Sequence, residues 1–271
     1  MYAGKFRTVD AHCHIYPEKI AARAICGTDT FYGLHSLKNG IVGDMIKEGS
    51  EQGIDRFVVQ SVASTPRQVK SINEFIAREE AEYKGILTGL GTLHPDSEDI
   101  EGDFEHLCEL NLHGVKLHPD IQSFRIDDKK CMKIYELCQS HGLPILMHTG
   151  DYRYDNSNPE RLLPVLKAFP SLTVVGAHLG GWSVWDEAAK KLSGFENLYV
   201  DTSSSFGFLT NEKMKELILA YGVDKVLFAT DYPMWDAADE LKRLLSLGFT
   251  DTEYEKLLGK NAAKVFGIGG F

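Results

Sequence analysis

The sequence predicts an α/β protein whose eight parallel strands and covering helices form a single (β/α)₈ barrel of the TIM type. Two observations support this prediction. Short apolar, β-branched runs alternate along the chain with segments of helical spacing, as parallel strands covered by helices do. The predicted strand ends lie 24 to 31 residues apart, after a first gap of 49, and one strand–helix unit with its loops needs about 25–30 residues. Because eight units favour a barrel over an open sheet, residues 1–271 are expected to form one domain.

The predicted strands occupy residues 7–14, 56–63, 86–94, 114–118, 144–149, 173–179, 198–203 and 225–231. Helices are predicted at 42–52, 66–83, 129–141, 159–169, 211–221 and 236–247, with a short helix after Asp251. Pro66 suits a first helical turn and Gly142 a helix end, since proline lacks an N–H and glycine accepts left-handed backbone angles. An irregular excursion, residues 15–42, follows the first strand. It is either a plain surface segment or a lid or substrate loop at the strand ends.

Composition and charge limit the classes of function. The hydrophobic fraction of 43% and the charged fraction of 25% are typical of a soluble globular protein. The sequence has neither a membrane-length apolar run nor a signal peptide's apolar core near its start. Five scattered cysteines indicate a reducing, cytoplasmic setting rather than a disulfide framework. A net charge of −10 disfavours nucleic acids and anionic membranes as partners, which leaves a small-molecule substrate; a homodimer is compatible with this composition.

Histidines and one acid gather where the predicted strands end. The residues at these positions are His12, His14, His94, His118, His148, His178 and Asp231. The C-terminal ends of barrel strands share one mouth, where the active sites of such barrels lie. Six of the ten histidines at these ends would be unusual for plain surface residues. Buried, hydrogen-bonded histidines with no ligand role are the alternative.

The segment Asp10-Ala-His-Cys-His14 is the strongest local signal. Because side chains alternate along a strand, His12 and His14 are expected to point to one side and Cys13 to the other, into the core. Two imidazoles about 7 Å apart at their Cα atoms can converge on one divalent ion. Two polar histidines on an exposed strand are the plain alternative.

The full set of motifs resembles the amidohydrolase superfamily, and more closely its branch with aminocarboxymuconate-semialdehyde decarboxylase-like enzymes. The resemblance rests on the His12–His14 pair, His148, His178 and Asp231, in this order. It also includes Gly114-Val-Lys-Leu-His-Pro119, the Gly180-Gly181 pair and Asn261-Ala-Ala-Lys-Val-Phe-Gly267, so it spans nearly the whole chain.

The resemblance implies that one divalent metal, usually Zn²⁺, is bound by His12, His14, His148 and Asp231. It implies that His178 polarises the substrate or moves protons. The residue chemistry agrees, since three neutral imidazoles and a carboxylate suit Zn²⁺ with an added water. Asp231 can then accept the proton of that water, with His178 stabilising the developing oxyanion.

Lys116 leaves the number of metal ions open. Some members of the superfamily carbamylate a lysine of the fourth strand so that it bridges two ions, and His178 would then be a ligand. Otherwise Lys116 and His118 line the pocket and bind an anionic substrate group, or form an internal polar network.

Four further residues are weaker candidates. His94, Trp182 and Arg153 are candidate substrate-binding residues. Asp201 either orients a ligand histidine or caps the following helix.

Three functions fit these residues. The first is hydrolysis of an amide, ester or lactone bond by metal-activated water. The second is non-oxidative decarboxylation of a small unsaturated or aromatic acid, which should need a cationic clamp; no arginine stands clearly at a strand end. The third, a non-catalytic zinc barrel, is disfavoured because structural zinc sites favour cysteine.

Overall fold

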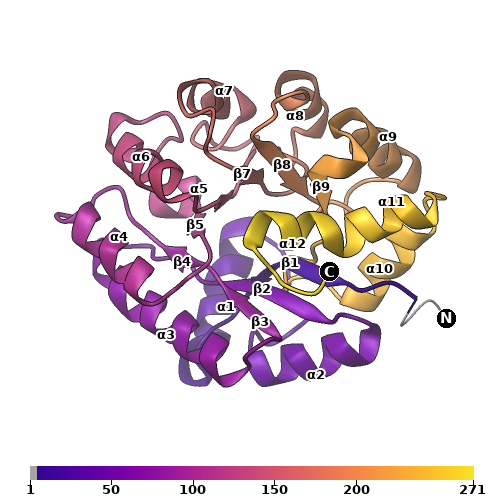
Figure 1. Cartoon of the computed structure of the whole chain (residues 1–271), viewed down its shortest axis with the longest axis horizontal. Coiled ribbons are helices and arrows are strands. Elements are labelled where there is room, and N and C mark those ends of the chain that lie inside the picture. Colours follow the sequence, from indigo (N-terminus) through magenta and orange to yellow (C-terminus); the bar gives the residue numbers. More distant parts are fainter. Residues whose placement is uncertain (1–4) are drawn as a thin grey trace.

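The structure is a computed structural model that describes residues 5–271. The first four residues of the N-terminal segment, in which no signal peptide is predicted, lie outside the described residues. Short strands occupy the centre and helices surround them (Figure 1). The strands are β1 (Val9–His14), β2 (Arg56–Gln60), β3 (Leu87–Gly89), β4 (Gly91–Thr92), β5 (Val115–Leu117), β6 (Ile145–Met147), β7 (Val174–Gly176), β8 (Leu198–Asp201) and β9 (Val226–Leu227).

The strands pair in parallel, in the order of the chain. The strand predicted at 86–94 is divided into β3, which pairs with β2, and β4, which pairs with β5. The last strand returns to the first, since the Ala11 N–H donates to the Phe228 carbonyl at 3.0 Å and Cys13 forms a parallel bridge with Tyr232. These contacts join the two ends of the strand row, and the predicted (β/α)₈ fold class is confirmed.

The helices follow the predicted alternation. They are α1 (Glu18–Tyr32), α2 (Val42–Gln52), α3 (Val69–Glu82), α4 (Ile100–Glu109), α5 (Pro119–Gln122), α6 (Met132–His141), α7 (Pro159–Ala168), α8 (Trp185–Leu192), α9 (Asn211–Tyr221), α10 (Ala237–Leu245), α11 (Asp251–Glu255) and α12 (Asn261–Phe266). Short turns of other helix types are η1 (Pro66–Gln68), η2 (Lys129–Cys131), η3 (Val223–Lys225) and the π-helical η4 (Lys256–Lys260). Within residues 5–271, no helix has both the length and the apolar character that crossing a membrane requires.

The apolar core forms two layers. One cluster fills the barrel interior with residues such as Val9, Val58 and Val175, and it includes Phe266 of α12. The other cluster lies between the strands and the surrounding helices. Helix α12 therefore covers the N-terminal end of the barrel, and the C-terminal ends of the strands are left for a site.

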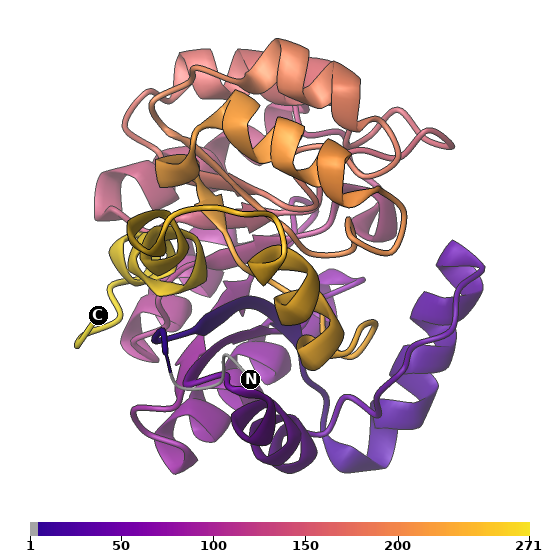
Figure 2. The ribbon, with the colours of Figure 1, turned by 90° about the vertical axis from the view of Figure 1, so that its right-hand side faces the viewer.

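The excursion predicted as irregular contains the 15-residue helix α1, which corrects that prediction. Only Ala21 of this helix is buried, and the helix includes Gly27 and Thr28, which are weak helix formers. Weak helix formers of this kind obscure the helical pattern in the sequence. In Figure 2, α1 stands apart from the other helices, at the end of the barrel opposite α12.

Candidate metal centre

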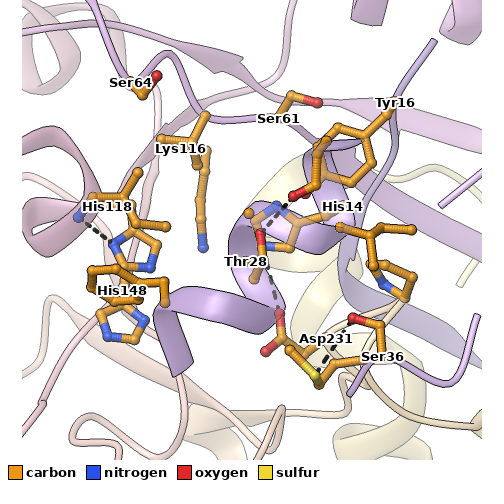
Figure 3. Close-up of a pocket in the computed structure, with 18 of the residues that line it drawn as sticks. His14, Tyr16, Thr28, Ser36, Ser61, Ser64, Lys116, His118, His148 and Asp231 are labelled. Atoms are coloured by element: carbon orange, nitrogen blue, oxygen red, sulfur yellow. Dashed lines mark hydrogen bonds and ion pairs between the residues drawn. The ribbon is translucent and has the colours of Figure 1, made fainter. Parts of the chain in front are cut away.

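The C-terminal ends of the strands open into a cavity of about 880 Å³, and Figure 3 shows part of its lining. The predicted site residues that line it are His12, His14, Lys116, His118, His148, His178, Trp182 and Asp231. They come from β1, β5 and the segments that follow β5, β6, β7 and β9. The cavity thus brings together residues that are far apart in the sequence.

A bulge in β1 sets the directions of the paired histidines. Between Asp10 and Cys13, β1 contains one residue more than the segment of β2 with which it pairs. Ala11 therefore packs inside the barrel, whereas Cys13 packs in the layer that faces the helices. The Nε2 atoms of His12 and His14 approach to 3.1 Å. The predicted shared direction of the two imidazoles, and the core position of Cys13, are confirmed.

Asp231 completes a group of three metal-type donors. Its Oδ1 lies 3.4 Å from His12 Nε2 and 3.5 Å from His14 Nε2. Two imidazole nitrogens and one carboxylate oxygen suit a divalent ion such as Zn²⁺, so the side chains fit the implied metal. Asp231 also has a left-handed φ of 62°, a costly conformation for a residue with a side chain and one that is frequent at functional sites.

Asp201 orients His12 toward this group. Asp201 Oδ2 lies 2.9 Å from His12 Nδ1. A carboxylate only accepts, so Nδ1 carries the proton and the Nε2 lone pair faces His14 and Asp231. Burial raises the pKa of Asp201, but the nearby imidazoles outweigh burial and the pKa falls to about 2. The helix α9 is capped by Thr210 instead, so Asp201 makes the histidine contact rather than the cap.

Lys116 is a buried cation inside the same group. Its Nζ lies 2.8 Å from His12 Nε2, and the residue is only 1% exposed. Burial lowers the pKa of Lys116 to about 8, although the carboxylates of Asp231 and Asp201 oppose that shift. In the view of Figure 3, its side chain runs between His14 and Asp231 on one side and His118 and His148 on the other.

Replacing Lys116 by methionine is expected to raise the stability of the chelator-treated protein at pH 7 by about 1–3 kcal/mol. The folded-state pKa lies below the ordinary value of 10.5, so the cost of burying the charge is present in full below pH 8. That cost is lost as the pH rises toward 10.5. Methionine is chosen because it keeps the length of the side chain without its charge. Urea unfolding at pH 7 and pH 10 measures this: the variant's advantage should shrink at pH 10. A variant less stable than the wild type at pH 7 would contradict it.

His148 lies in a second group of donors with His118 and Asp120. The donor atoms of the three residues lie within 4.8 Å of one another. The two imidazole rings stack with centroids 4.0 Å apart, and burial lowers the pKa of each. Within the described part of the chain, the buried Oδ1 atom of Asp120 has no hydrogen-bond partner, and burial raises the pKa of this carboxyl to about 6. The structure therefore separates His148 from the His12–His14–Asp231 group.

His178 connects the two groups. Its Nε2 lies 3.0 Å from His148 Nδ1, and its ring stacks on that of His12 with centroids 5.4 Å apart. Its Nδ1 lies 3.0 Å from the carbonyl oxygen of Ser203. Burial lowers the pKa of His178, and the carboxylates of Asp231 and Asp201 oppose that shift. Like Asp231, His178 has a left-handed φ, here 59°.

Two predicted substrate-binding residues lie outside the lining. His94 is buried, and its Nδ1 accepts the Asp96 N–H at 3.1 Å. The guanidinium of Arg153 is occupied by the carboxylate of Asp151 and by the Phe31 carbonyl, 2.7 Å from Nη1. The structure does not place either residue at the donor groups, whereas Trp182 lines the cavity as expected.

Two residues of the site, Tyr32 and Asp120, were not predicted from the sequence. Tyr32 of α1 contacts His118 Nε2 through its hydroxyl, at 2.7 Å. Asp120 follows His118 and Pro119 directly, and this adjacency was a usable signal. Tyr32 had none, because it belongs to the segment predicted as irregular.

Solved structures of similar fold span the whole barrel. A 5-carboxyvanillate decarboxylase from Sphingomonas paucimobilis matches with a TM-score of 0.75 and 16% identity, covering 97% of this chain and 99% of that one. A Pseudomonas putida protein described provisionally as a 2-pyrone-4,6-dicarboxylic acid hydrolase has a TM-score of 0.70, 16% identity and coverage of 98% and 99%. A dihydroxybenzoic acid decarboxylase from Polaromonas sp. JS666, with bound manganese and 2-nitroresorcinol, has a TM-score of 0.74, 16% identity and 98% coverage of both chains.

These likenesses show the fold, and the sequence family identifies the class. A comparison with curated proteins finds no match. The family model described as amidohydrolase matches residues 9–268, nearly the whole chain. The chain therefore belongs to the amidohydrolase family and is an enzyme of the amidohydrolase superfamily.

Proposed function

We propose that the protein is a metal-dependent hydrolase that cleaves an amide, ester or lactone bond of a small molecule. One divalent ion, Zn²⁺, would be held by His12, His14 and Asp231. The family resemblance implies His148 as a fourth ligand, and its ring would have to turn from its contacts with His178 and Gly150 to reach the ion. The convergence of three donor atoms inside the cavity carries this proposal. When bound, such an ion lowers the pKa of a water toward neutrality and polarises a substrate carbonyl.

Asp231 is proposed as the general base. Burial raises its pKa, but the nearby imidazoles of His12, His178 and His14 outweigh burial, so its pKa lies well below the ordinary value. Asp231 is therefore ionised at pH 7 and can accept a proton at its carboxylate. Ser204 donates to Oδ2 at 2.5 Å, which leaves Oδ1 facing the cavity.

His178 is proposed to hold or move a proton at Nε2. A carbonyl only accepts, so the contact with Ser203 requires the proton of His178 on Nδ1. The contact of His148 Nε2 with the Gly150 carbonyl, at 3.1 Å, likewise requires a proton on that nitrogen. In the neutral pair, two lone pairs would then face each other across the 3.0 Å contact. A proton shared between His178 Nε2 and His148 Nδ1 would relieve this repulsion, which supports a proton-holding role for His178 Nε2.

Hydrolysis is favoured over decarboxylation because, among the described residues, no arginine of the cavity lining lies at the donor groups. A decarboxylase needs a clamp for the carboxylate, and Arg23 is the one arginine in the lining formed by the described residues. Arg23 is exposed on α1 rather than placed at the donor groups. Decarboxylation of a small unsaturated or aromatic acid is the second candidate. Lys116, a buried cation in contact with His12, favours it, as do the names of two of the compared enzymes.

A substrate panel separates the two reactions. The purified, zinc-loaded protein is incubated with esters, lactones and amides, and with hydroxybenzoic and unsaturated carboxylic acids. Released carboxylate and carbon dioxide are measured side by side. We expect turnover of a member of the first set and no carbon dioxide. Carbon dioxide release without hydrolysis would contradict the first proposal and support the second.

A further inference from the structure

One face of α1 lines the outer part of the cavity along most of the helix. The residues on this face are Ile20, Arg23, Ala24, Gly27, Thr28 and Phe31, which recur three or four positions apart. At about 1.5 Å per residue, this stripe is about 16 Å long. Apart from those of Arg23 and Thr28, the side chains of this stripe are apolar. An apolar helical stripe normally packs against protein, but this one faces an open cavity, and Ile20 is 47% exposed.

The wall formed by β2, the segment after it and α3 carries apolar side chains as well, beside the polar side chains Ser61, Ser64, Gln68 and Ser71. It includes Val62, after β2, and Ile72 and Phe75 of α3. The polar donors lie at the inner end of the same cavity, where His14 and Asp231 meet. The metal-type donors are therefore confined to the inner end of the cavity, and apolar side chains lie on both outer walls among polar ones.

Contacts at its C-terminal end hold α1 in this position. The Phe31 carbonyl accepts from Arg153 Nη1, and the Tyr32 hydroxyl contacts His118 Nε2 at 2.7 Å. The Arg153 guanidinium also lies over the Phe31 and Tyr32 rings, 5.1 and 5.3 Å from their centroids. The space between α1 and α3 is thus bounded by an anchored helix.

We infer that this groove between α1 and α3 binds an apolar chain or ring of the substrate. The substrate is then an amphipathic molecule whose reacting polar group lies at His12, His14 and Asp231. The inference rests on the proposed function for the position of that group. A substrate small enough to occupy only the donor groups would leave the apolar walls in contact with water, and burying them against an apolar chain is favourable.

Binding of straight-chain hydroxamates tests the inference, because a hydroxamate chelates the metal and its alkyl chain can be lengthened stepwise. Dissociation constants of acetohydroxamate, butanohydroxamate, hexanohydroxamate and octanohydroxamate are measured by calorimetry on the zinc-loaded protein. Full burial of a methylene group corresponds to about fourfold in affinity. We expect a gain of at least about twofold per methylene.

Gly27→Phe should abolish this gain. A Cβ added at Gly27 meets no atom within 4 Å, so the new ring can enter the groove. Octanohydroxamate should lose at least about tenfold in affinity, while acetohydroxamate changes by less than about twofold. The matched control is Ala22→Phe, which places the same ring on the opposite face of α1, where Ala22 lines a separate cavity. This control should retain the chain-length gain.

The outcomes distinguish the groove from the metal centre. Acetohydroxamate binding with no gain along the series, or a gain that survives in Gly27→Phe, would overturn the inference and leave the proposed function standing. If acetohydroxamate does not bind, the metal centre is contradicted. The groove is then tested on chelator-treated protein, from which the hydroxamates should displace bound anilinonaphthalene sulfonate. Stronger displacement by longer hydroxamates supports the groove. Displacement that is independent of chain length overturns it.

Discussion

His178→Ala is expected to lower kcat by about 10²- to 10⁴-fold while the protein keeps its metal. His178 Nε2 faces the cavity next to His148, and its Nδ1 is tied to Ser203. Its removal takes away the group proposed to move a proton or to stabilise an oxyanion, and leaves His12, His14 and Asp231 intact. Turnover of the best substrate of the panel, measured with metal content on the same sample, checks both parts.

The control for this variant is His141→Ala. His141 is exposed at the end of α6 and far from the cavity lining, so kcat should be unchanged. A metal-free His178→Ala protein would contradict the single-ion assignment, because His178 would then be a ligand. Full turnover in His178→Ala would contradict its catalytic role.

His12→Ala is expected to lower metal affinity by more than about 10²-fold and to abolish measurable turnover; even loss of a group that only orients a ligand costs about 10- to 100-fold in affinity. His12 is the centre of the first group, since its Nε2 contacts His14, Asp231 and Lys116. Competition with a chromogenic chelator measures the affinity.

Cys13→Ala is the matched control, one residue along the same strand. The bulge in β1 directs Cys13 into the core that faces the helices, so this variant should lose stability but keep the ion. Metal loss from Cys13→Ala as severe as from His12→Ala would show that the strand, rather than the imidazole, determines binding.

The repeating strand–helix pattern made the fold predictable, because it depends on apolar periodicity that the sequence displays directly. The ends of the elements were less predictable. The strand predicted at 225–231 is reduced to β9 (Val226–Leu227), and Asp231, at the predicted end, has a left-handed φ of 62°. Helix α1 was missed because the weak helix formers Gly27 and Thr28 lie within it.

The members of the site were predictable to a similar extent. Strand ends and side-chain alternation indicated His12, His14 and Asp231, which the structure brings together. The division of the pocket into two donor groups depends on side-chain directions after the strands end, so the grouping of His148 with Asp120 has no signature in the sequence. The ion pair between Arg153 and Asp151 likewise could not be predicted from the sequence.

The metal content of the purified wild-type protein tests the central claim most directly. The protein is expressed without added metal and analysed by mass spectrometry of the elements, with His12→Ala alongside. We expect about one equivalent of a divalent transition metal per chain, and almost none in His12→Ala. About two equivalents, with a carbamate mass on Lys116, would contradict the single-ion site. A fully active wild-type protein without metal would contradict the metal centre itself.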